Sequence, residues 1–273
     1  MSELEKVRHV CGISGGKDSA ALAIYLKDVR KLQHVEYFFS DTGKELPEVY
    51  DFLDRMEAYL GQEIVRIGAN KTFEHFLKLY GNFLPSPRQR WCTRELKIKP
   101  FEKWIGDVPA ISYVAIRADE PAREGYISTK PNIQAVLPFR EDGITKADVF
   151  RILEESVGVP SYYSWRSRSG CYFCFFQQRG EWQNLKRVHP ELFEAAKEFE
   201  KADSLTGKTY TWIQGLPLAE LEKQKQRPFA GALSKIGPYT WQEQLAGDSV
   251  RRPDVDNPGE SKEDSDGCLI CHL

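Results

Sequence analysis

The segment GISGGKDSA, residues 12–20, combines the residue types that bind phosphate through the backbone. Lys17 adds a positive charge, and a helix starting near Asp18 would point its positive dipole end at an anion. The Walker loop requires Ser or Thr directly after its lysine, but here Ser19 comes one position late. The segment therefore predicts a phosphate-binding loop of another type. Backbone N–H groups would converge on the anion at the small residues Ser14, Gly15 and Gly16.

Cysteine pairs form a second group whose spacing suits chemistry. The pattern C-x-x-C occurs at Cys171 and Cys174 and again at Cys268 and Cys271. Two thiolates at this spacing can bind one metal ion or one cluster. In a reducing compartment, where disulfides are rare, such pairs indicate metal or redox chemistry. Cys11 lies in an apolar stretch and is predicted to be a small core residue.

Strands and helices that alternate along the first half of the chain must position these groups. We predict strands over 7–13, 34–41, 63–68 and 110–118, with helices between them. This alternation favours an α/β fold with a doubly wound, mainly parallel, Rossmann-like sheet and right-handed crossovers. The phosphate loop then lies at the carboxyl end of the first strand, where ligands bind in such sheets.

Several helix ends are marked by their residue types. Pro47 suits the first turn of a helix that Gly61 would end, and Thr145 with Asp148 resembles a capping box for an amphipathic helix over 144–155. The helix that starts at Pro47 is expected to bury Val49, Phe52, Leu53, Met56 and Leu60. The helix after the phosphate loop is expected to bury Leu22, Tyr25, Leu26, Val29 and Leu32.

Composition divides the chain into three parts. Residues 1–158 are predicted to form the nucleotide-binding α/β domain. Residues 159–242 are predicted to be a cysteine-bearing, helical and irregular region packed on it, with no regular structure over 160–183 and a helix over 189–202. Residues 243–273 are polar and rich in Pro and Gly, which predicts a mobile tail ending in C-x-x-C.

The charge balance limits the partners that the chain can bind. The net charge is −2, without the excess of Lys and Arg typical of nucleic-acid-binding proteins, so such contact would need a local patch. No signal peptide or membrane-spanning run is visible, and we expect a cytoplasmic protein without membrane association. The candidate patch comprises Arg88, Arg90, Arg94, Lys97, Lys99, Lys103, Arg166, Arg168 and Arg179, interleaved with Tyr162, Tyr163 and Trp165.

Four segments resemble known enzymes in order along residues 7–180. SGGKDS resembles the SGGxDS loop of the PP-loop ATP pyrophosphatases, the HUP-type adenine nucleotide α-hydrolase-like superfamily, which cleave ATP between the α- and β-phosphates. The other three are similar to segments of the phosphoadenylylsulfate (PAPS) reductase-like family. They are DTGKELPEV (41–49), WCTRELKIKP (91–100) and IRADEPAR (116–123), the last with Ala115 and Pro121 in place of the family's glycine and serine.

The resemblance implies a site for ATP with Mg²⁺. Lys17, Asp18 and Arg117 would be catalytic, since a guanidinium can neutralise charge that moves to the leaving pyrophosphate. Asp18 would cap the helix or help to hold Mg²⁺. The alternative for Arg117 is a surface salt bridge with Asp119 or Glu120. The implied nucleotide-binding residues are Ser14, Gly15, Gly16, Lys17, Asp18, Ser19, Asp41, Thr42, Arg117 and Arg123.

The resemblance also implies a 4Fe-4S cluster on Cys92, Cys171 and Cys174. The family's tandem cysteines become Trp91-Cys92 here, so one ligand is missing. The fourth iron is then either open to sulfide or substrate, or held by a cysteine of the tail, which we prefer. The alternative is zinc, bound by the two C-x-x-C pairs, Cys171, Cys174, Cys268 and Cys271.

Three enzymatic functions and one other remain open at this stage. We favour an ATP pyrophosphatase that adenylates an acceptor for iron–sulfur-assisted sulfur transfer, with a cysteine desulfurase as sulfur donor and a DNA backbone phosphate as acceptor, as in DNA phosphorothioate modification. The alternatives are thiolation of tRNA, reduction of adenylylsulfate or PAPS to sulfite, and an iron–sulfur module that senses nucleotides. The reductases' C-terminal E-C-G-x-H motif is absent from the end of this sequence, GCLICHL, which argues against reduction. The sequence leaves open whether the protein forms a homodimer.

Overall fold

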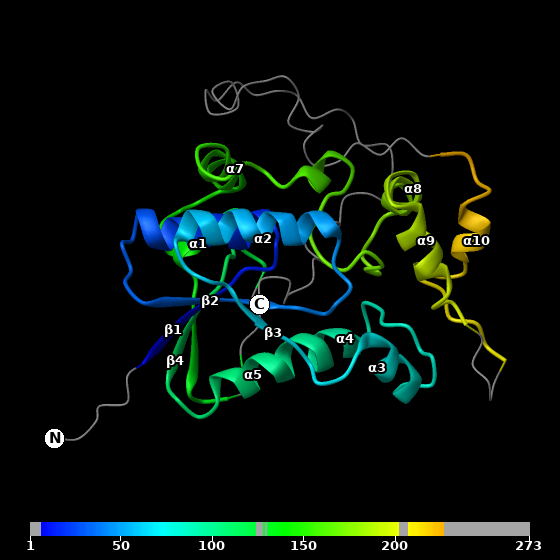
Figure 1. The fold of residues 1–273 in the computed structure, drawn as a ribbon, viewed down its shortest axis with the longest axis horizontal. Helices are drawn as coiled ribbons and strands as arrows, with labels where there is room; N and C mark the ends of the chain where they lie inside the picture. Colours follow the sequence, from blue (N-terminus) through cyan, green and yellow to red (C-terminus); the bar gives the residue numbers. More distant parts are fainter. Residues whose placement is uncertain (1–6, 124–127, 129, 202–206, 227–273) are drawn as a thin grey trace.

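The computed structural model describes residues 7–123, 128, 130–201 and 207–226. A five-stranded sheet forms its centre, and every neighbouring pair of strands is parallel (Figure 1). The predicted α/β class with a doubly wound parallel sheet is confirmed. Across the sheet the strands lie in the order β3 (Val65–Ile67), β2 (Val35–Ser40), β1 (Arg8–Gly12), β4 (Ala110–Tyr113) and β5 (Ile133–Val136).

Helices cover both faces of the sheet. In Figure 1, α1 (Lys17–Asp28), α2 (Pro47–Leu60) and α7 (Lys146–Glu154) lie on one face, and α5 (Lys99–Ile105) lies on the other. A large apolar core fills the first face, and a smaller one that includes Val10 and Phe38 lies beneath α5. The remaining helical elements are α3 (Phe73–Leu79), α4 (Trp91–Thr93), a π-helical turn (Arg94–Ile98), α6 (Pro138–Glu141), a 3₁₀ turn (Ser161–Ser164), α8 (Arg179–Val188), α9 (Pro190–Lys197) and α10 (Leu218–Leu221).

The predicted helix ends are largely confirmed. Pro47 is the first residue of α2, and Gly61 closes the helix in the left-handed conformation with φ 72°. All five apolar positions predicted for the face of α2 are buried. The capping box of Thr145 and Asp148 is present at the start of α7. A helix bounded by such local signals can be located from its sequence, because its end groups are satisfied within a few residues.

Other boundaries differ from the predictions. The strand predicted over 110–118 ends at Tyr113, and the helix predicted over 189–202 is α9, which ends at Lys197. Val29 lies beyond the end of α1 and is 59% exposed, so its predicted place on the buried face was wrong. The segment 160–183, predicted as irregular, contains the 3₁₀ turn and the start of α8. The proposed domain boundaries remain predictions, and residues 243–273 lie outside the described residues.

The strand order creates a switch point beside β1. The chain runs from β1 to β2 and β3 on one side, and then returns to β4 on the other side of β1. Loops after β1 and β4 therefore leave the sheet in opposite directions, and the carboxyl ends of these two strands frame a crevice of the kind that binds ligands. The phosphate loop follows β1, and Arg117 follows β4.

Candidate nucleotide site

The glycines of the phosphate loop are required by close contacts. Gly15 has φ 74°, and a Cβ built there would lie 2.6 Å from Cγ1 of Val49 on α2. A Cβ on Gly16 would lie 2.5 Å from Oγ of Ser169. Neighbouring elements thus approach the loop backbone to distances that side chains would prevent. Gly16 is also the N-cap residue of α1, so the loop leads directly into the positive end of that helix.

Two serines hold the loop in shape. The hydroxyl of Ser19 accepts a hydrogen bond from the backbone N–H of Ser14 at 3.1 Å and lies 3.1 Å from the Ser14 hydroxyl. It also donates to the carbonyl oxygen of Gly16 at 3.2 Å. Both side chains are buried. Ser19 therefore braces the loop from within, a structural role that adds to the nucleotide-binding role predicted for it.

A buried group of charges lies at the first turn of α1. Asp18 Oδ2 is 2.7 Å from Nζ of Lys17, and Oδ1 is 2.8 Å from Nη1 of Arg117. The side chains of all three are at most 12% exposed. Burial alone would lower the pKa of Lys17 and of Arg117, but Asp18, together with Tyr163 at Lys17 and with Glu120 and Asp119 at Arg117, raises both pKa values. Both cations therefore stay charged at neutral pH.

Arg117 contacts carboxylates of its own segment and of the phosphate loop, and its catalytic role stays a prediction. It pairs with Asp119 at 2.8 Å and lies 3.5 Å from Glu120. These two residues are the partners expected in the salt-bridge alternative. The guanidinium is nevertheless buried, and its third partner is Asp18 of the phosphate loop. Glu120 also pairs with Arg123 at 2.8 Å. Both predicted arginines thus belong to one charged network at the carboxyl end of β4.

Asp18 does not cap its helix. The N-cap is Gly16, which has no side chain, and no side-chain capping bond is present there. This correction has a simple cause, because Asp18 lies inside the first turn of α1 and its oxygens are taken by two cations. A role in holding Mg²⁺ stays a prediction.

The DTG segment makes a tight turn at the end of β2. Asp41 Oδ1 accepts hydrogen bonds from the Gly43 N–H at 2.8 Å and from the Tyr50 hydroxyl at 2.9 Å. Thr42 donates its hydroxyl hydrogen to Glu45 Oε1 at 2.8 Å. Asp41 therefore has an immediate role in shaping this turn, and its predicted contact with a nucleotide stays a prediction.

Residues 160–183, the cysteine-bearing segment, contact the phosphate loop directly. Tyr162 donates its hydroxyl hydrogen to the carbonyl oxygen of Gly15 at 2.6 Å, and the Tyr163 hydroxyl accepts from the Lys17 N–H at 3.1 Å. The N–H of Tyr172 donates to the carbonyl oxygen of Lys44 at 2.9 Å, which ties the segment to the turn after β2 as well. These contacts join residues more than 120 positions apart, so periodicity and spacing carried no signal for them.

Two of the predicted cluster cysteines, Cys171 and Cys174, lie in one turn beside the DTG segment. Cys171 Sγ lies 3.3 Å from the Thr42 hydroxyl and 3.7 Å from Glu45 Oε1, and the N–H of Cys174 bonds to the carbonyl oxygen of Cys171. Burial, and then the Glu45 carboxylate, raise the pKa of the Cys171 thiol well above its ordinary value.

Within the described residues, no three cysteine, histidine or acidic side chains are grouped as metal ligands. Cys268 and Cys271 lie outside the described residues. Both the 4Fe-4S cluster and the zinc alternative stay predictions, while Cys11 is fully buried in the core, as predicted.

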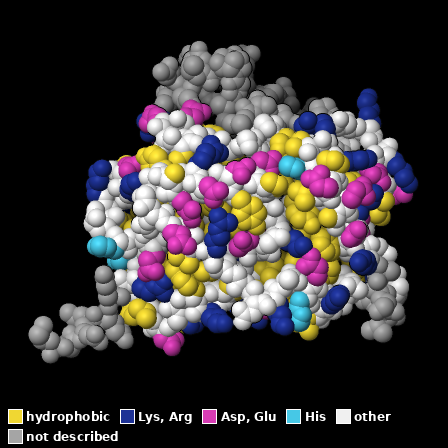
Figure 2. Space-filling model, in the orientation of Figure 1, with side chains coloured by type: hydrophobic (Ala, Val, Ile, Leu, Met, Phe, Trp, Pro, Cys, Tyr) yellow, Lys and Arg dark blue, Asp and Glu magenta, His cyan; other side chains and the backbone are white. Residues whose placement is uncertain are grey.

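The predicted basic patch is divided by the structure. Arg94 and Lys99 both pair with Glu95. Arg166 is fully buried and bonds to backbone carbonyl oxygens, and the aromatic residues Tyr162, Tyr163 and Trp165 are buried too. Arg94 and Lys99 remain exposed, whereas Arg166 and the three aromatic residues are buried, and nucleic-acid binding by the patch stays a prediction. Figure 2 shows acidic and basic side chains intermixed over the visible face.

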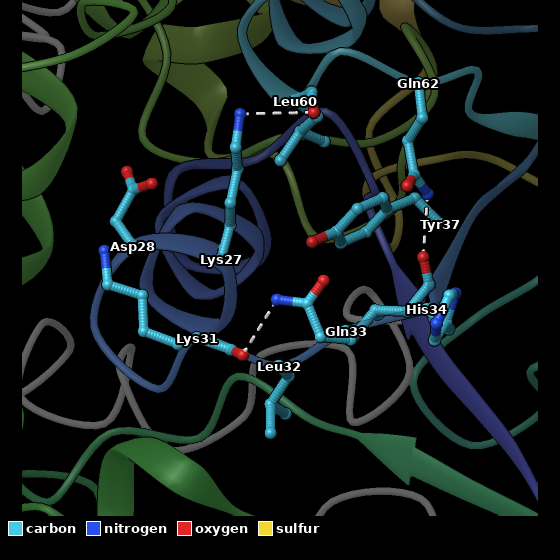
Figure 3. A pocket seen from close by; sticks show the side chains of 10 residues that line it. Lys27, Asp28, Lys31, Leu32, Gln33, His34, Tyr37, Leu60 and Gln62 are labelled. Carbon is cyan, nitrogen blue, oxygen red and sulfur yellow. Dashed lines mark hydrogen bonds between the residues drawn. The ribbon is translucent and has the colours of Figure 1, made fainter.

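A separate cavity of about 350 Å³ lies at the opposite, amino end of β2 (Figure 3). Two of its polar side chains bond to neighbouring backbone. Lys27 donates to the carbonyl oxygens of Tyr59 and Leu60 at the end of α2, and Gln62 donates to the carbonyl oxygen of Val35. These contacts join α1, α2 and β2, and the cavity lies at the end of α1 away from the phosphate loop.

The structure is an α/β fold with a glycine-rich loop between β1 and α1, at the switch point of its parallel sheet. Residues 8–139, slightly less than half of the chain, match the model of the phosphoadenosine phosphosulfate reductase domain. The match includes the phosphate loop, the DTG turn and the Arg117 network. The match does not identify a particular substrate. Among the described residues, no helix combines the length and the apolar character needed to cross a membrane.

Two relatives and one solved structure are similar to this chain. Two uncharacterized proteins of Methanocaldococcus jannaschii, MJ0066 and MJ0973, are 28% and 24% identical over 205 and 190 residues. The alignments cover 70% and 66% of this chain but 41% and 44% of the relatives, so the chain spans less than half of their length. The crystal structure of PAPS reductase from Candida auris, in a phosphate complex, has a TM-score of 0.42 and 15% identity, covering 54% of this chain and 72% of that chain.

Proposed function

We propose that this chain is an ATP pyrophosphatase that adenylates an acceptor for sulfur transfer, with a DNA backbone phosphate as the favoured acceptor. The observation that carries the proposal is the buried group of Lys17, Asp18 and Arg117 at the start of α1. It places two permanent cations directly behind a loop whose backbone N–H groups can bind phosphate. Such a preorganised arrangement stabilises charge that moves to a leaving pyrophosphate.

The proposed reaction has two substitutions at phosphorus, followed by a thiol exchange that releases the product. An acceptor oxygen attacks the α-phosphorus of ATP, the bond from that phosphorus to the bridging oxygen breaks, and pyrophosphate leaves. The terminal sulfur of a persulfide, supplied by a cysteine desulfurase, then displaces AMP. A second thiol releases the thiolated product by taking the donor sulfur into a disulfide.

The chain's own residues act mainly on the first substitution. The loop at Ser14, Gly15 and Gly16 orients the phosphates, and Lys17 and Arg117 neutralise the charge that develops on pyrophosphate. Asp18 holds both cations in place and is a candidate partner for Mg²⁺ when the nucleotide arrives. The proposal retains an iron–sulfur cluster on Cys92, Cys171 and Cys174, with a further ligand, and no chemical step is assigned to it.

The direct experiment is a pyrophosphate-release assay on anaerobically purified protein. ATP alone, ATP with DNA and ATP with tRNA are compared, and release stimulated by DNA is the expected result. The variant Asp18→Ala is expected to abolish release while the iron content per chain stays that of the unmodified protein. Stimulation by tRNA instead of DNA would assign the acceptor to the tRNA-thiolation alternative.

A second candidate function is reduction of adenylylsulfate or PAPS. It is favoured by the match of residues 8–139 to the phosphoadenosine phosphosulfate reductase domain. In that reaction a cysteine attacks the sulfur of the activated sulfate and sulfite is released. Sulfite formation from either compound, without any cleavage of ATP, would reject the pyrophosphatase proposal.

A further inference from the structure

Two arginines beside the phosphate loop share one aromatic ring. The guanidinium carbon of Arg90 lies 4.9 Å from the ring centre of Phe176, and that of Arg168 lies 5.1 Å from the same centre. The two guanidinium carbons are therefore at most 10.0 Å apart. Arg90 is the N-cap residue of α4, whereas the other two come from the cysteine-bearing segment. Cation–π contact fixes where both charges lie.

Neither arginine is neutralised within the described residues. Both side chains are half-buried, and neither forms an ion pair there. The hydrogen bond of Arg90 is made by Nε to the carbonyl oxygen of Pro87, which leaves its outer nitrogens available. Most other half-buried arginines of the described chain, such as Arg8 and Arg123, pair with a carboxylate. Two half-buried guanidinium groups without a carboxylate partner mark a place where an anion is favourable.

The position of the pair points to the second substrate of the proposed reaction. Ser169, next to Arg168, contacts the phosphate loop at Gly16. In the proposed function, the phosphate loop, Lys17 and Arg117 already bind the phosphates of ATP. A further pair of cations beside them suits an acceptor that is itself anionic, and a guanidinium binds phosphate oxygens through two parallel N–H groups.

We propose that Arg90 and Arg168, oriented by Phe176, bind the phosphodiester backbone of a nucleic-acid acceptor. This proposal rests on the function proposed above, since it assigns the acceptor side of the same site. From the predicted basic patch it selects the two arginines that share the ring of Phe176.

Salt dependence of binding provides the test, because each lost phosphate contact changes it by a known amount. A fluorescein-labelled single strand of DNA is titrated with the full-length protein at several salt concentrations, and fluorescence anisotropy gives Kd. For single strands, each contact contributes about 0.7 to the slope of log K against log salt. Arg90→Ala and Arg168→Ala are each expected to reduce the slope by about that amount, and the double variant by about twice as much.

Three variants control for other causes. Arg151→Ala removes the same charge from α7, where Arg151 pairs with Asp148, and is expected to leave the slope unchanged. Arg168→Lys keeps the charge and is expected to keep the slope. Phe176→Leu keeps both arginines but removes the ring face, and is expected to weaken binding less than the double arginine variant. Circular dichroism melts of each variant check that it is folded.

The outcomes separate this proposal from the function on which it rests. An unchanged slope in the double variant would overturn the inference, even if DNA stimulates pyrophosphate release. Loss of affinity for ATP or pyrophosphate, with DNA binding intact, would also overturn it and assign the pair to the nucleotide. Arginine-dependent DNA binding without any pyrophosphate release would support the inference and reject the proposed function.

Discussion

At the scale of single residues, Asp18 organises the candidate site. Its two oxygens each hold a different cation, and all three side chains are buried. Removing one partner from such a group leaves charges in a medium that solvates them poorly. Asp18 is therefore a structural residue as well as a candidate for catalysis, and a loss of activity in its variants must be read together with stability.

The first prediction concerns the stability of this charged group. Asp18→Asn keeps the shape of the side chain but leaves Lys17 and Arg117 without their shared carboxylate, and should lower the free energy of unfolding by about 3 to 5 kcal/mol. Urea denaturation measures it. The matched control is Asp54→Asn, whose pair with Arg66 is exposed and should contribute no more than about 1 kcal/mol. Equal effects of the two variants would contradict the buried network.

The second prediction concerns Gly15. Gly15→Ala combines a left-handed φ with a contact of 2.6 Å to Val49, so it should destabilise the protein and weaken ATP binding. Gly43→Ala is the control, because Gly43 has φ 67° but nothing lies within 4 Å of its added Cβ. It should cost only about 1 kcal/mol of backbone strain. Thermal melts with and without ATP compare the two variants, and similar losses in both would argue against close packing at the loop.

At the scale of elements, local signals determine where several helices begin and end. The capping box of α7 satisfies its own end groups, and Pro47 with Gly61 bounds α2. α7 in turn packs against α1, the helix that carries Lys17 and Asp18. A change at a helix end can therefore reach the site through packing alone.

The third prediction concerns the pH dependence of the α7 cap. Burial alone would raise the pKa of Asp148, but hydrogen bonds from Thr145 and the charge of Arg151 lower it below its ordinary value. Because the folded pKa is the lower one, the carboxylate stabilises the fold above about pH 4, and this stabilisation is lost as the pH falls through the folded pKa. Asp148→Asn should cost about 1 kcal/mol at pH 7 and less near pH 3, measured by urea denaturation. A cost that does not change with pH would disprove the mechanism.

At the scale of the whole molecule, the cysteine-bearing segment closes over the carboxyl ends of β1 and β2. Buried hydroxyls of Tyr162 and Tyr163 bond to the loop backbone, and Cys171 lies against Thr42. The phosphate loop is thus one wall of a site whose other wall comes from the second half of the chain. Any chemistry between a nucleotide and the cysteines depends on this docking.

The fourth prediction tests the docking. Tyr162→Phe removes a buried hydrogen bond of 2.6 Å to Gly15 and should lower stability by about 1 to 3 kcal/mol. Tyr172→Phe is the control within the same segment, because its hydroxyl makes no hydrogen bond among the described residues. Thermal unfolding followed by near-UV circular dichroism compares the two. Equal behaviour would mean that the segment is not held by the loop.

The fifth prediction concerns the metal. Anaerobically purified protein should contain iron, and Cys171→Ser or Cys174→Ser should lose it, whereas Cys11→Ser should not, as measured by elemental analysis. Cys268→Ser and Cys271→Ser in the full chain test the predicted tail ligand. Zinc at one ion per chain, lost on changing either C-x-x-C pair, would establish the alternative.

Local and periodic features were predictable from the amino-acid sequence. The parallel sheet, the limits of α2, the cap of α7 and the place of the phosphate loop all follow from patterns within a few residues, because backbone hydrogen bonding and helix capping are short-range. The loop and the DTG turn could be recognised for the same reason, since their glycines and charges lie next to one another.

Tertiary structure alone decided how those charges are shared. The bond of Asp18 to Arg117, the tyrosine hydroxyls on the loop, the burial of Arg166 and the ring shared by Arg90 and Arg168 all join distant parts of the chain. Burial and long-range pairing depend on which surfaces meet when the chain folds, and no local pattern encodes them. The sequence located the glycine-rich loop, and the fold determined which cations pair with Asp18 and which form no ion pair among the described residues.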